Sequence, residues 1–115
     1  MKKSLLGMVV LALLSISTHA ETKKYYDSGA LHFIFPTKIN GKLEGTVTEF
    51  YKNGNVKYKW SYHKGFKHGV AKKYEKGHLK YTWFYKWGER SLTTKEFHRD
   101  GTLKKKWKEN QCKID

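Results

Sequence analysis

The stretch from Phe50 to Tyr74, FYKNGNVKYKWSYHKGFKHGVAKKY, decides the fold of this chain. It starts at the end of an aromatic strand, turns at Asn53-Gly54, and continues as a strand in which tyrosine and tryptophan alternate with polar residues. A second glycine turn follows, and the chain returns to Tyr74, where the same pattern begins again. Two strands and two turns therefore make one unit of the chain.

Glycines repeat this unit along most of the sequence. One series has separations of 25, 23 and 24 residues, and a leucine or valine stands two positions after each member. A second series has separations of 24 and 23 residues. A fixed period in this range is typical of a repeat array whose units cannot bury their apolar faces alone. The first series is Gly29, Gly54, Gly77 and Gly101, and the second is Gly41, Gly65 and Gly88, with Gly45 and Gly69 four residues after its first two members.

The segments between the glycines have the period of a β-strand. Residues 56–63 read VKYKWSYH and residues 79–86 read LKYTWFYK, so every second side chain is aromatic or aliphatic. A helix would mix these side chains with the lysines on one stripe, whereas a strand separates them onto two faces. Turns such as Asn53-Gly54 supply glycine where a tight hairpin needs positive φ. Pro36, the only proline, should end the second strand or lie on a sheet edge.

We therefore predict an all-β fold of about four repeats of roughly 24 residues each within a domain of residues 21–115. The strands should form one elongated antiparallel meander, curled so that its aromatic side is buried against itself, because isolated hairpins are only marginally stable. We expect eight strands, near residues 23–27, 30–36, 45–51, 55–63, 69–75, 78–86, 91–98 and 102–108. The residues expected to build the repeats are Tyr26, Gly29, Leu31, Tyr51, Gly54, Val56, Trp60, Gly65, Gly69, Tyr74, Gly77, Leu79, Trp83, Gly101, Leu103 and Trp107.

The first twenty residues have the pattern of a secretory signal peptide. Two lysines precede a largely apolar run from Leu5 to Ile16, and Thr18-His19-Ala20 offers small residues at a cleavage site. The alternative is a retained anchor, but the apolar run is well short of the ~20 residues that span a bilayer. We predict cleavage after Ala20, a periplasmic or secreted product, and no transmembrane segment in the mature chain.

The mature chain is strongly basic. Without Lys2 and Lys3, 22 basic residues stand against 10 acidic ones, a net charge of +12 before histidine is counted. Such a charge favours contact with anionic lipid, lipopolysaccharide, acidic glycan or nucleic acid. Export argues against nucleic acid as the natural partner. The alternative is that the lysines only keep an aromatic sheet soluble.

Cys112 is the only cysteine, so the domain has no internal disulfide. In an oxidising compartment a lone thiol near the C-terminus either stays free or joins two chains. A dimer linked through Cys112 is therefore one of two open alternatives.

The repeats resemble the MORN-repeat variant of bacterial proteins, including the YwqK-like antitoxin component family. The likeness covers nearly all of residues 24–107, although His98 replaces the aromatic residue of the last unit and Leu92 stands where a glycine is expected. It implies hairpins stacked into an elongated curved sheet and a role in binding proteins or membrane lipids, with no catalytic residues. The segments that carry the resemblance are Tyr26-Asp-Ser-Gly29-Ala-Leu31, Tyr51-Lys-Asn-Gly54-Asn-Val56, Tyr74-Glu-Lys-Gly77-His-Leu79, His98-Arg-Asp-Gly101-Thr-Leu103 and Lys64-Gly65-Phe-Lys-His-Gly69.

Signals of catalysis are sparse. The sequence has no nucleophile motif, phosphate loop or dinucleotide fingerprint. Glu49 and Glu96 occupy equivalent places and could meet only across a repeat, which makes a carboxylate-pair active site a weak alternative. We therefore predict a protein that is not an enzyme, with no catalytic residues and no cofactor.

Histidines gather around the second turn of the central unit. His63, His68 and His78 are close in sequence, and His32 is a candidate for the same polar face. Their spacing matches no known ligand template, and histidines in loops are usually solvated. We predict no metal site here.

The polar strand positions carry the candidate binding surface. Rolling the sheet would align recurring lysines into a basic strip, with Lys72, Lys73 and Lys95 nearby, and aromatic neighbours would add contacts for a sugar ring or an acyl chain. The predicted binding residues are Lys57, Lys59, Lys80, Lys104, Lys106, Phe84 and Trp87. We expect them to bind an anionic envelope component, either a lipid or glycan surface or a partner protein.

An alternative function is protein recognition by an edge strand, either the first strand, Lys23 to Asp27, or the last, Thr102 to Lys108. The chain would then be the partner, or the antitoxin-like component, of a two-protein system. The lysines of the last strand are typical protection against such pairing. Salt separates the two functions, because it weakens a charged surface contact far more than strand addition.

Overall fold

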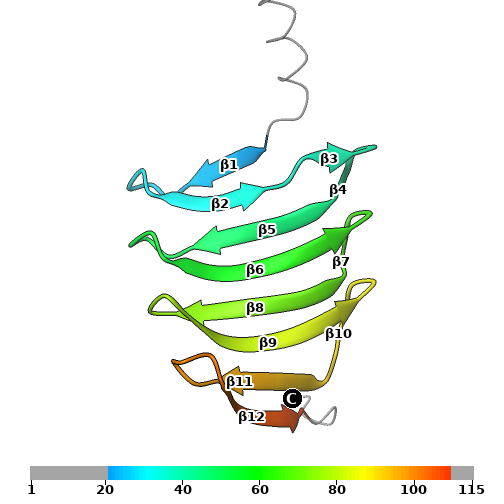
Figure 1. Ribbon diagram of the computed structural model, residues 1–115. Helices are drawn as coiled ribbons and strands as arrows, with labels where there is room; N and C mark the ends of the chain where they lie inside the picture. Colours follow the sequence, from blue (N-terminus) through cyan, green and yellow to red (C-terminus); the bar gives the residue numbers. More distant parts are fainter. Residues whose placement is uncertain (1–20, 110–115) are drawn as a thin grey trace, which may run out of the picture.

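The computed structural model describes residues 21–109, and within this range the chain is a meander of antiparallel strands without a helix (Figure 1). The main sheet has the order β1-β2-β5-β6-β8-β9-β11-β12; β7 pairs with β6 and β10 with β9, while β3 and β4 form a separate ribbon. The strands are β1 Thr22–Tyr25, β2 Leu31–Phe35, β3 Lys38–Ile39, β4 Lys42–Leu43, β5 Gly45–Phe50, β6 Val56–His63, β7 Phe66–Lys67, β8 Gly69–Glu75, β9 His78–Lys86, β10 Glu89–Arg90, β11 Thr93–Phe97 and β12 Leu103–Lys108.

The eight strands of the main path confirm the predicted all-β meander, within a few residues at each end. β2 ends at Phe35, directly before Pro36, as the proline required. Four two-residue strands, β3, β4, β7 and β10, were not predicted. The predicted signal peptide and Cys112 lie outside the described residues.

The short strands build hairpin tips along one edge of the sheet, on the right in Figure 1. Three two-residue turns form these tips, Asn40-Gly41, Lys64-Gly65 and Trp87-Gly88, and all six residues have φ between 48° and 88°. Positive φ at both central residues is the type I′ geometry, whose twist matches that of the flanking strands. We call this row of turns the tip edge.

Tyrosines tie the repeat units together at the opposite edge. The Tyr26 hydroxyl donates a hydrogen bond of 2.7 Å to the Phe50 carbonyl, at the end of the next unit's strand. The Tyr51 hydroxyl does the same, at 3.2 Å, to the Tyr74 carbonyl. Tyr26 and Tyr51, which open the first two units, therefore each link to the following unit, and His98 at the equivalent place has no hydroxyl to make this bond.

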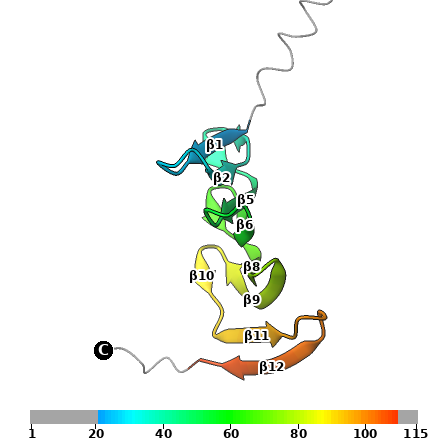
Figure 2. The same ribbon diagram turned by 90° about the vertical axis from the view of Figure 1, so that its left-hand side faces the viewer.

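The sheet twists along its length. β5 and β6 are seen nearly end-on in Figure 2, whereas β11 and β12 run across the view. This progressive rotation is the normal right-handed twist of neighbouring strands. It gives the sheet the curled shape that the sequence predicted.

The buried core is small. Val47, Ala71 and Thr94 are buried, with 3%, 1% and 3% of their surface exposed, and they lie at equivalent positions of successive units. They are the Cα partners of Trp60, Trp83 and Trp107. We expected the aromatic side to be buried against itself, and this is wrong: the tryptophan rings stay partly exposed because no second layer of residues 21–109 covers them.

A β-bulge follows the first turn of each unit. The register runs from Glu49↔Tyr58 to Phe50↔Val56, so Lys57 is an extra residue opposite the partner strand. In a bulge two residues face one residue of the neighbouring strand, which turns the extra side chain from its alternating position. The equivalent extra residues are His32, Lys57, Lys80 and Lys104.

Candidate functional site

One face of the sheet carries half of the 18 phenylalanine, tyrosine and tryptophan rings, and we call it the aromatic face. Its rings contact one another within and between units: Tyr58 stacks on Trp60 at 4.8 Å between centroids, and meets Trp83 edge-on at 6.2 Å. Alternation along the strands places the other side chains on the opposite, outer face. The rings of the aromatic face belong to Phe33, Phe35, Tyr58, Trp60, Tyr62, Tyr81, Trp83, Tyr85 and Trp107.

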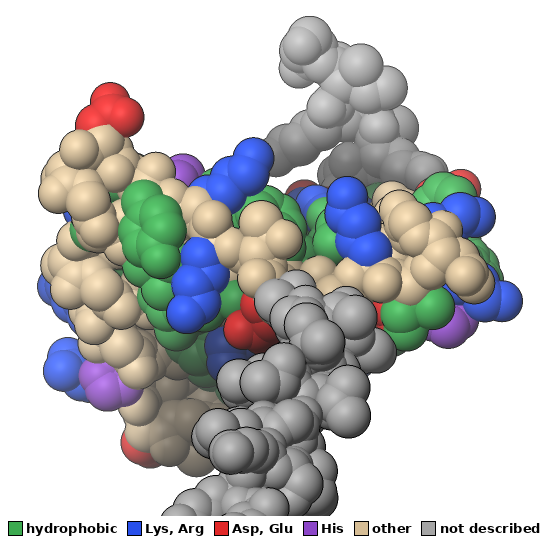
Figure 3. Space-filling view, turned by 90° about the horizontal axis from the view of Figure 1, so that it is seen from above, with side chains coloured by type: hydrophobic (Ala, Val, Ile, Leu, Met, Phe, Trp, Pro, Cys, Tyr) green, Lys and Arg blue, Asp and Glu red, His purple; other side chains and the backbone are tan. Residues whose placement is uncertain are grey.

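Cations from the tip edge lie over the tryptophans. Lys67 Nζ is 4.9 Å from the centroid of the Trp60 ring and 5.0 Å from that of Tyr85. Arg90, one unit further on, places its guanidinium carbon 4.8 Å from the centroid of Trp83. Such cation–π contacts contribute about 0.5–1 kcal/mol each at exposed sites. Seen from above, hydrophobic and basic side chains lie side by side on the surface (Figure 3).

The bulge residues form ion pairs with carboxylates of the neighbouring strands. Glu49 Oε2 lies 3.1 Å from His32 Nε2 and 3.8 Å from Lys57 Nζ. Glu96 Oε2 lies 2.8 Å from Lys80 Nζ and 3.5 Å from Lys104 Nζ. Across the sheet these side chains and Lys73 form one row, in which basic residues flank a carboxylate towards each end, and we call it the charge ladder: His32, Glu49, Lys57, Lys73, Lys80, Glu96 and Lys104.

A single register rule describes these ion pairs. Glu49 is the Cα partner of Phe33 and Tyr58, and it binds the residue directly before each of them. Glu96 is the Cα partner of Tyr81 and Lys105, and again binds the residue before each. The four ion pairs therefore follow from the bulges, which turn the preceding residue toward the carboxylate.

Lys73 is the exception in the charge ladder, because a lysine stands where the other units have a carboxylate. It occupies the place of Glu49 and Glu96 in its own unit, with Tyr58 and Tyr81 as its Cα partners. The register rule points it at Lys57 and Lys80, which are cations like itself. Among residues 21–109 Lys73 has no ion-pair partner, and its Nζ lies 5.8 Å from the centroid of the Tyr58 ring.

The ion pair at the far end of the ladder shifts the titration of both partners. The hydrogen bond with Glu96 raises the pKa of Lys80. The same bond, with the charge of Lys104, lowers the pKa of Glu96. Both groups therefore hold their charged forms more firmly than in water.

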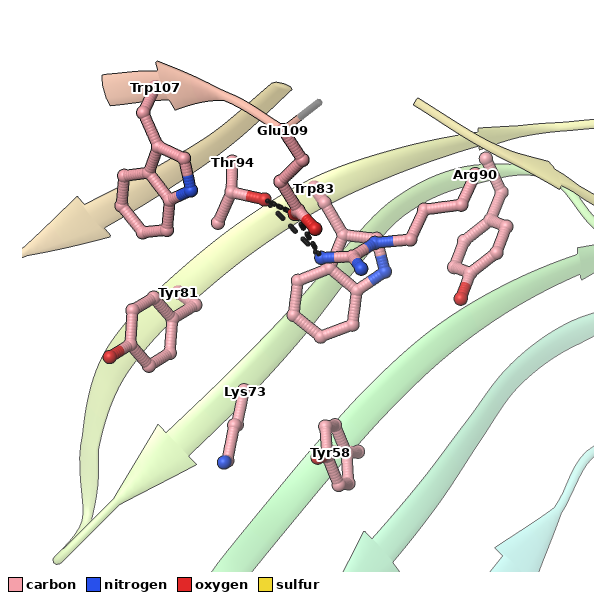
Figure 4. Close-up of a pocket in the computed structure, with 9 residues that line it drawn as sticks. Tyr58, Lys73, Tyr81, Trp83, Arg90, Thr94, Trp107 and Glu109 are labelled. Atoms are coloured by element: carbon pink, nitrogen blue, oxygen red, sulfur yellow. Dashed lines mark hydrogen bonds and ion pairs between the residues drawn. The ribbon is translucent and has the colours of Figure 1, made fainter. Parts of the chain in front are cut away.

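A hollow of about 440 Å³ opens at the centre of the aromatic face. Figure 4 shows Lys73 between Tyr58 and Tyr81 on one side of it and Arg90 near Trp83 on the other. The hollow is lined by Tyr58, Lys73, Tyr81, Trp83, Tyr85, Arg90, Thr94, Trp107 and Glu109. Its size is within the range of about 300–1,000 Å³ that is usual for small-molecule sites.

Polar groups meet at the Arg90 end of the hollow. Glu109 Oε2 lies 3.2 Å from Arg90 Nη2 and accepts a hydrogen bond of 2.8 Å from the Thr94 hydroxyl. Arg90 also donates to Thr94 Oγ1 at 3.3 Å. The indole Nε1 of Trp83 is buried and has no hydrogen-bond partner among residues 21–109. A buried donor of this kind is uncommon.

The predicted basic strip is divided between the two faces. Lys57, Lys80 and Lys104 reach the carboxylates of the charge ladder on the aromatic face. Lys59 and Lys106 pair across the sheet with Lys72 and Lys95 on the outer face, which also carries Phe84 as the partner of Val70. The expectation that these residues line one strip is wrong, because the bulges turn three of the five lysines to the other side.

Trp87 lies at the tip edge, apart from the lysines of the aromatic face and those of the outer face. It is 48% exposed and has a φ of 48°, a left-handed conformation that is costly for a bulky residue. Its ring centroid is 4.5 Å from that of His68 and 6.4 Å from that of the exposed Phe66. Trp87 therefore belongs to a small exposed aromatic cluster with these neighbours.

The histidines are dispersed. His63 and His68 have ring centroids 6.0 Å apart, but His63 Nδ1 is 2.7 Å from Glu44 Oε2, while His32 is bound to Glu49. Hydrogen bonds from His63 and from the Lys64 amide lower the pKa of Glu44. Among residues 21–109 no group of three or more histidine, cysteine or acidic side chains is placed to hold a metal ion.

From the sequence, Lys73 was expected only beside the predicted strip, and neither Lys67 nor Arg90 was predicted to belong to a site. The sequence held only a divided signal for Lys73: it follows Gly69 by four residues as Glu49 follows Gly45, but counting back from Gly77 puts Lys72 in the place that Glu49 and Glu96 hold before Gly54 and Gly101. The cations at the tip edge had no such signal, because the short strands that carry them were not predicted. Within the described residues no helix has the length and apolar character to cross a membrane.

Comparison with known proteins identifies one repeat unit. The profile of the MORN repeat variant matches residues 40–64, from the turn before β4 to the turn after β6. No curated protein and no solved structure matches the chain significantly. The chain thus contains a MORN-variant repeat within a β-rich module, an architecture suited to binding or protein interaction.

Proposed function

We propose that this chain is an exported, non-enzymatic module of hairpin repeats that binds an anionic envelope component or partner protein through its aromatic face. The observation that carries the proposal is the open state of this face: rings and cations lie side by side, and no other layer of residues 21–109 covers them. Contiguous apolar surface that stays accessible is characteristic of an interaction site.

The charge of the chain supports an anionic partner. Residues 21–115 carry a net charge of +12 before histidine is counted. A field of this size raises the local concentration of anions and speeds their association, and it is screened by salt. On the aromatic face the cations lie next to rings, so a partner with both charged and apolar parts can contact both.

A binding role also suits the state of the carboxylates on this face. Glu49, Glu96 and Glu109 are each held in an ion pair with a basic side chain. A general acid or base must exchange its proton near neutral pH, whereas the lowered pKa of Glu96 keeps that carboxylate ionised. The same carboxylates instead hold basic side chains in place: Glu49 and Glu96 hold lysines of the charge ladder, and Glu109 holds Arg90 at the central hollow.

Binding to anionic surfaces tests the proposal. Co-sedimentation of residues 21–115 with lipopolysaccharide, or with vesicles containing phosphatidylglycerol, should retain the protein at low salt and release it as salt approaches about 0.3 M. A triple variant with Lys57, Lys73 and Lys80 changed to glutamine should lose most of this binding. The matched control carries the same charge change on the outer face, at Lys59, Lys72 and Lys95.

Equal losses of binding in the two triple variants would show that only net charge determines binding, and would contradict a specific role for the aromatic face. Retention at high salt would also contradict the proposal. The export step has its own readout, because mass spectrometry of the secreted protein should find a chain that begins at Glu21.

Edge-strand pairing is the second candidate function. β1 is an edge of the main sheet and all four of its residues are exposed; such an edge offers backbone groups to a partner strand. The chain would then act as one component of a two-protein system, as in the YwqK-like antitoxins that the repeats resemble. A proline in place of Lys23 should block this mode and leave binding to anionic surfaces unchanged.

A further inference from the structure

We infer that the centre of the aromatic face is a site for an acidic saccharide, with Lys73 as the contact for its anionic group. This inference rests on the proposed function, because it names the class of ligand for the same face. Its starting point is the exception in the charge ladder. Where the neighbouring units place Glu49 and Glu96, this unit places a lysine between two other lysines.

The exception leaves a positive charge that nothing else in the described chain neutralises. Lys57 and Lys80 already bind Glu49 and Glu96, at 3.8 and 2.8 Å, whereas Lys73 has no such partner among residues 21–109. Like charges in adjacent rows of a sheet are unfavourable. A bound anion would convert this unfavourable row into the alternating order of the rest of the ladder.

The surroundings of Lys73 favour a ligand with flat, apolar faces. Lys73 opens onto the hollow of about 440 Å³, together with the rings of Tyr58, Tyr81, Trp83 and Trp107. Figure 4 shows these rings around the hollow from several strands. The carbon-bound hydrogens of a pyranose face pack well on such rings, which offer large rigid apolar areas.

The other end of the hollow favours a ligand with hydroxyl groups. The Glu109 carboxylate and the Thr94 hydroxyl can accept hydrogen bonds, and Arg90 donates them. Hydroxyls that both donate and accept can satisfy this mixed set, which a simple anion cannot.

An extended peptide fits this site less well. β9, at the centre of the hollow, is hydrogen-bonded to β8 on one side and β11 on the other. Its backbone groups are therefore occupied, and the face offers only side chains to a ligand. Peptide strands are usually recognised through backbone hydrogen bonds, so the groups present match a carbohydrate better.

The experiment uses the mature chain, residues 21–115, and three probes: a trimer of galacturonic acid, the neutral trimer maltotriose, and inorganic phosphate. Titration calorimetry and tryptophan fluorescence report binding. The variants are Lys73→Glu, Lys73→Gln and the control Lys72→Glu, which makes the same charge change on the neighbouring residue of the outer face. All are compared at about 0.1 M salt, where long-range effects of net charge are screened.

We expect the acidic trimer to bind the unchanged chain at least about tenfold more tightly than maltotriose or phosphate. Lys73→Glu and Lys73→Gln should each weaken it about tenfold or more, as for the loss of a charged hydrogen bond. Lys72→Glu should change it less than about threefold. Equal weakening by Lys72→Glu and Lys73→Glu would overturn the site. Failure of the acidic trimer to bind would also overturn the saccharide site. If lipopolysaccharide or vesicles still bind in a salt-sensitive way in that case, the proposed function stands and only the saccharide site is refuted.

Discussion

Replacing Lys73 with glutamate should make the folded chain more stable. The change restores the alternating order of the charge ladder, because a carboxylate at this place has Lys57 and Lys80 one residue before its Cα partners, Tyr58 and Tyr81. Glu49 and Glu96 reach lysines in this same register, at 3.8 and 2.8 Å. A substitution that reverses a charge in a binding site usually serves to remove function; here it should also remove a repulsive contact.

The size of the effect follows from the exposure of the groups. Lys57 and Lys80 are about one-third exposed, with 34% and 31% of their side-chain surface accessible, and ion pairs at such sites contribute about 0.2–1 kcal/mol. Both lysines already have a carboxylate partner, so a second one adds less than a first. Relief of repulsion and one shared ion pair together give about 1 kcal/mol, or a rise in melting temperature of about 4–8 °C for a domain of this size.

Thermal unfolding followed by circular dichroism measures this shift. Lys73→Met should give about half of it, because it removes the repulsion without adding a carboxylate. Lys23→Glu is the control for net charge: it makes the same charge change on β1, opposite the uncharged Ile34. The gain from Lys73→Glu should shrink in about 1 M salt. A Lys73→Glu chain that melts no higher than the Lys23→Glu chain would refute the register argument for the ladder.

Three further outcomes test other parts of the structure. The bond to Lys80 lowers the pKa of Glu96, so the ionised carboxylate stabilises the folded chain, and this contribution is lost as pH falls below the ordinary carboxyl range. In the Glu96→Gln variant the melting temperature should therefore fall less between about pH 5 and pH 3 than in the unchanged chain. Trp87→Asn replaces a bulky residue at a φ of 48° by one that accepts it, so relief of backbone strain should offset the lost ring contacts and keep the melting temperature within about 4 °C. Tyr26→Phe removes a 2.7 Å bond to the Phe50 carbonyl and should cost about 1 kcal/mol; no change in melting would show that the link between units is not a stabilising one.

The strands and turns were predictable because their signals are local. Alternation over residues 56–63 and 79–86 fixes the strand period, and the glycine series fixes where each strand ends. The predicted glycines at the turns all have positive φ, including Gly54 and Gly101. These features depend on a few neighbouring residues each, so one sequence is enough to read them.

The position of the lysines depended on something that one strand cannot reveal. A bulge is an extra residue relative to the partner strand, and Lys57 appears within an unbroken alternation when β6 is read alone. Only the pairing Glu49↔Tyr58 followed by Phe50↔Val56 shows that Lys57 has no opposite residue. The sequence therefore predicted that these lysines recur together and placed them on the wrong face.

The aromatic rings stay partly exposed for a related reason. Period-two alternation predicts that one face is apolar, but it does not say what lies on that face. Within residues 21–109 the partial cover comes from side chains of the same sheet, such as Lys67 over Trp60 and Arg90 over Trp83. The cover is charged and flexible, and it leaves the central hollow open.

Most cations of the aromatic face stabilise the fold, because they cover aromatic rings or pair with carboxylates. Changing Lys67 or Arg90 would expose a tryptophan and weaken both stability and any binding, so such variants cannot separate the two. Lys57 and Lys80 are held by Glu49 and Glu96 in the same way. Lys73 differs, because its register sets it beside two other lysines and its cation–π contact, 5.8 Å from the centroid of Tyr58, is longer than those of Lys67 and Arg90. A lysine that makes the sheet less stable and opens onto a hollow among aromatic rings is explained most simply by a ligand that needs it.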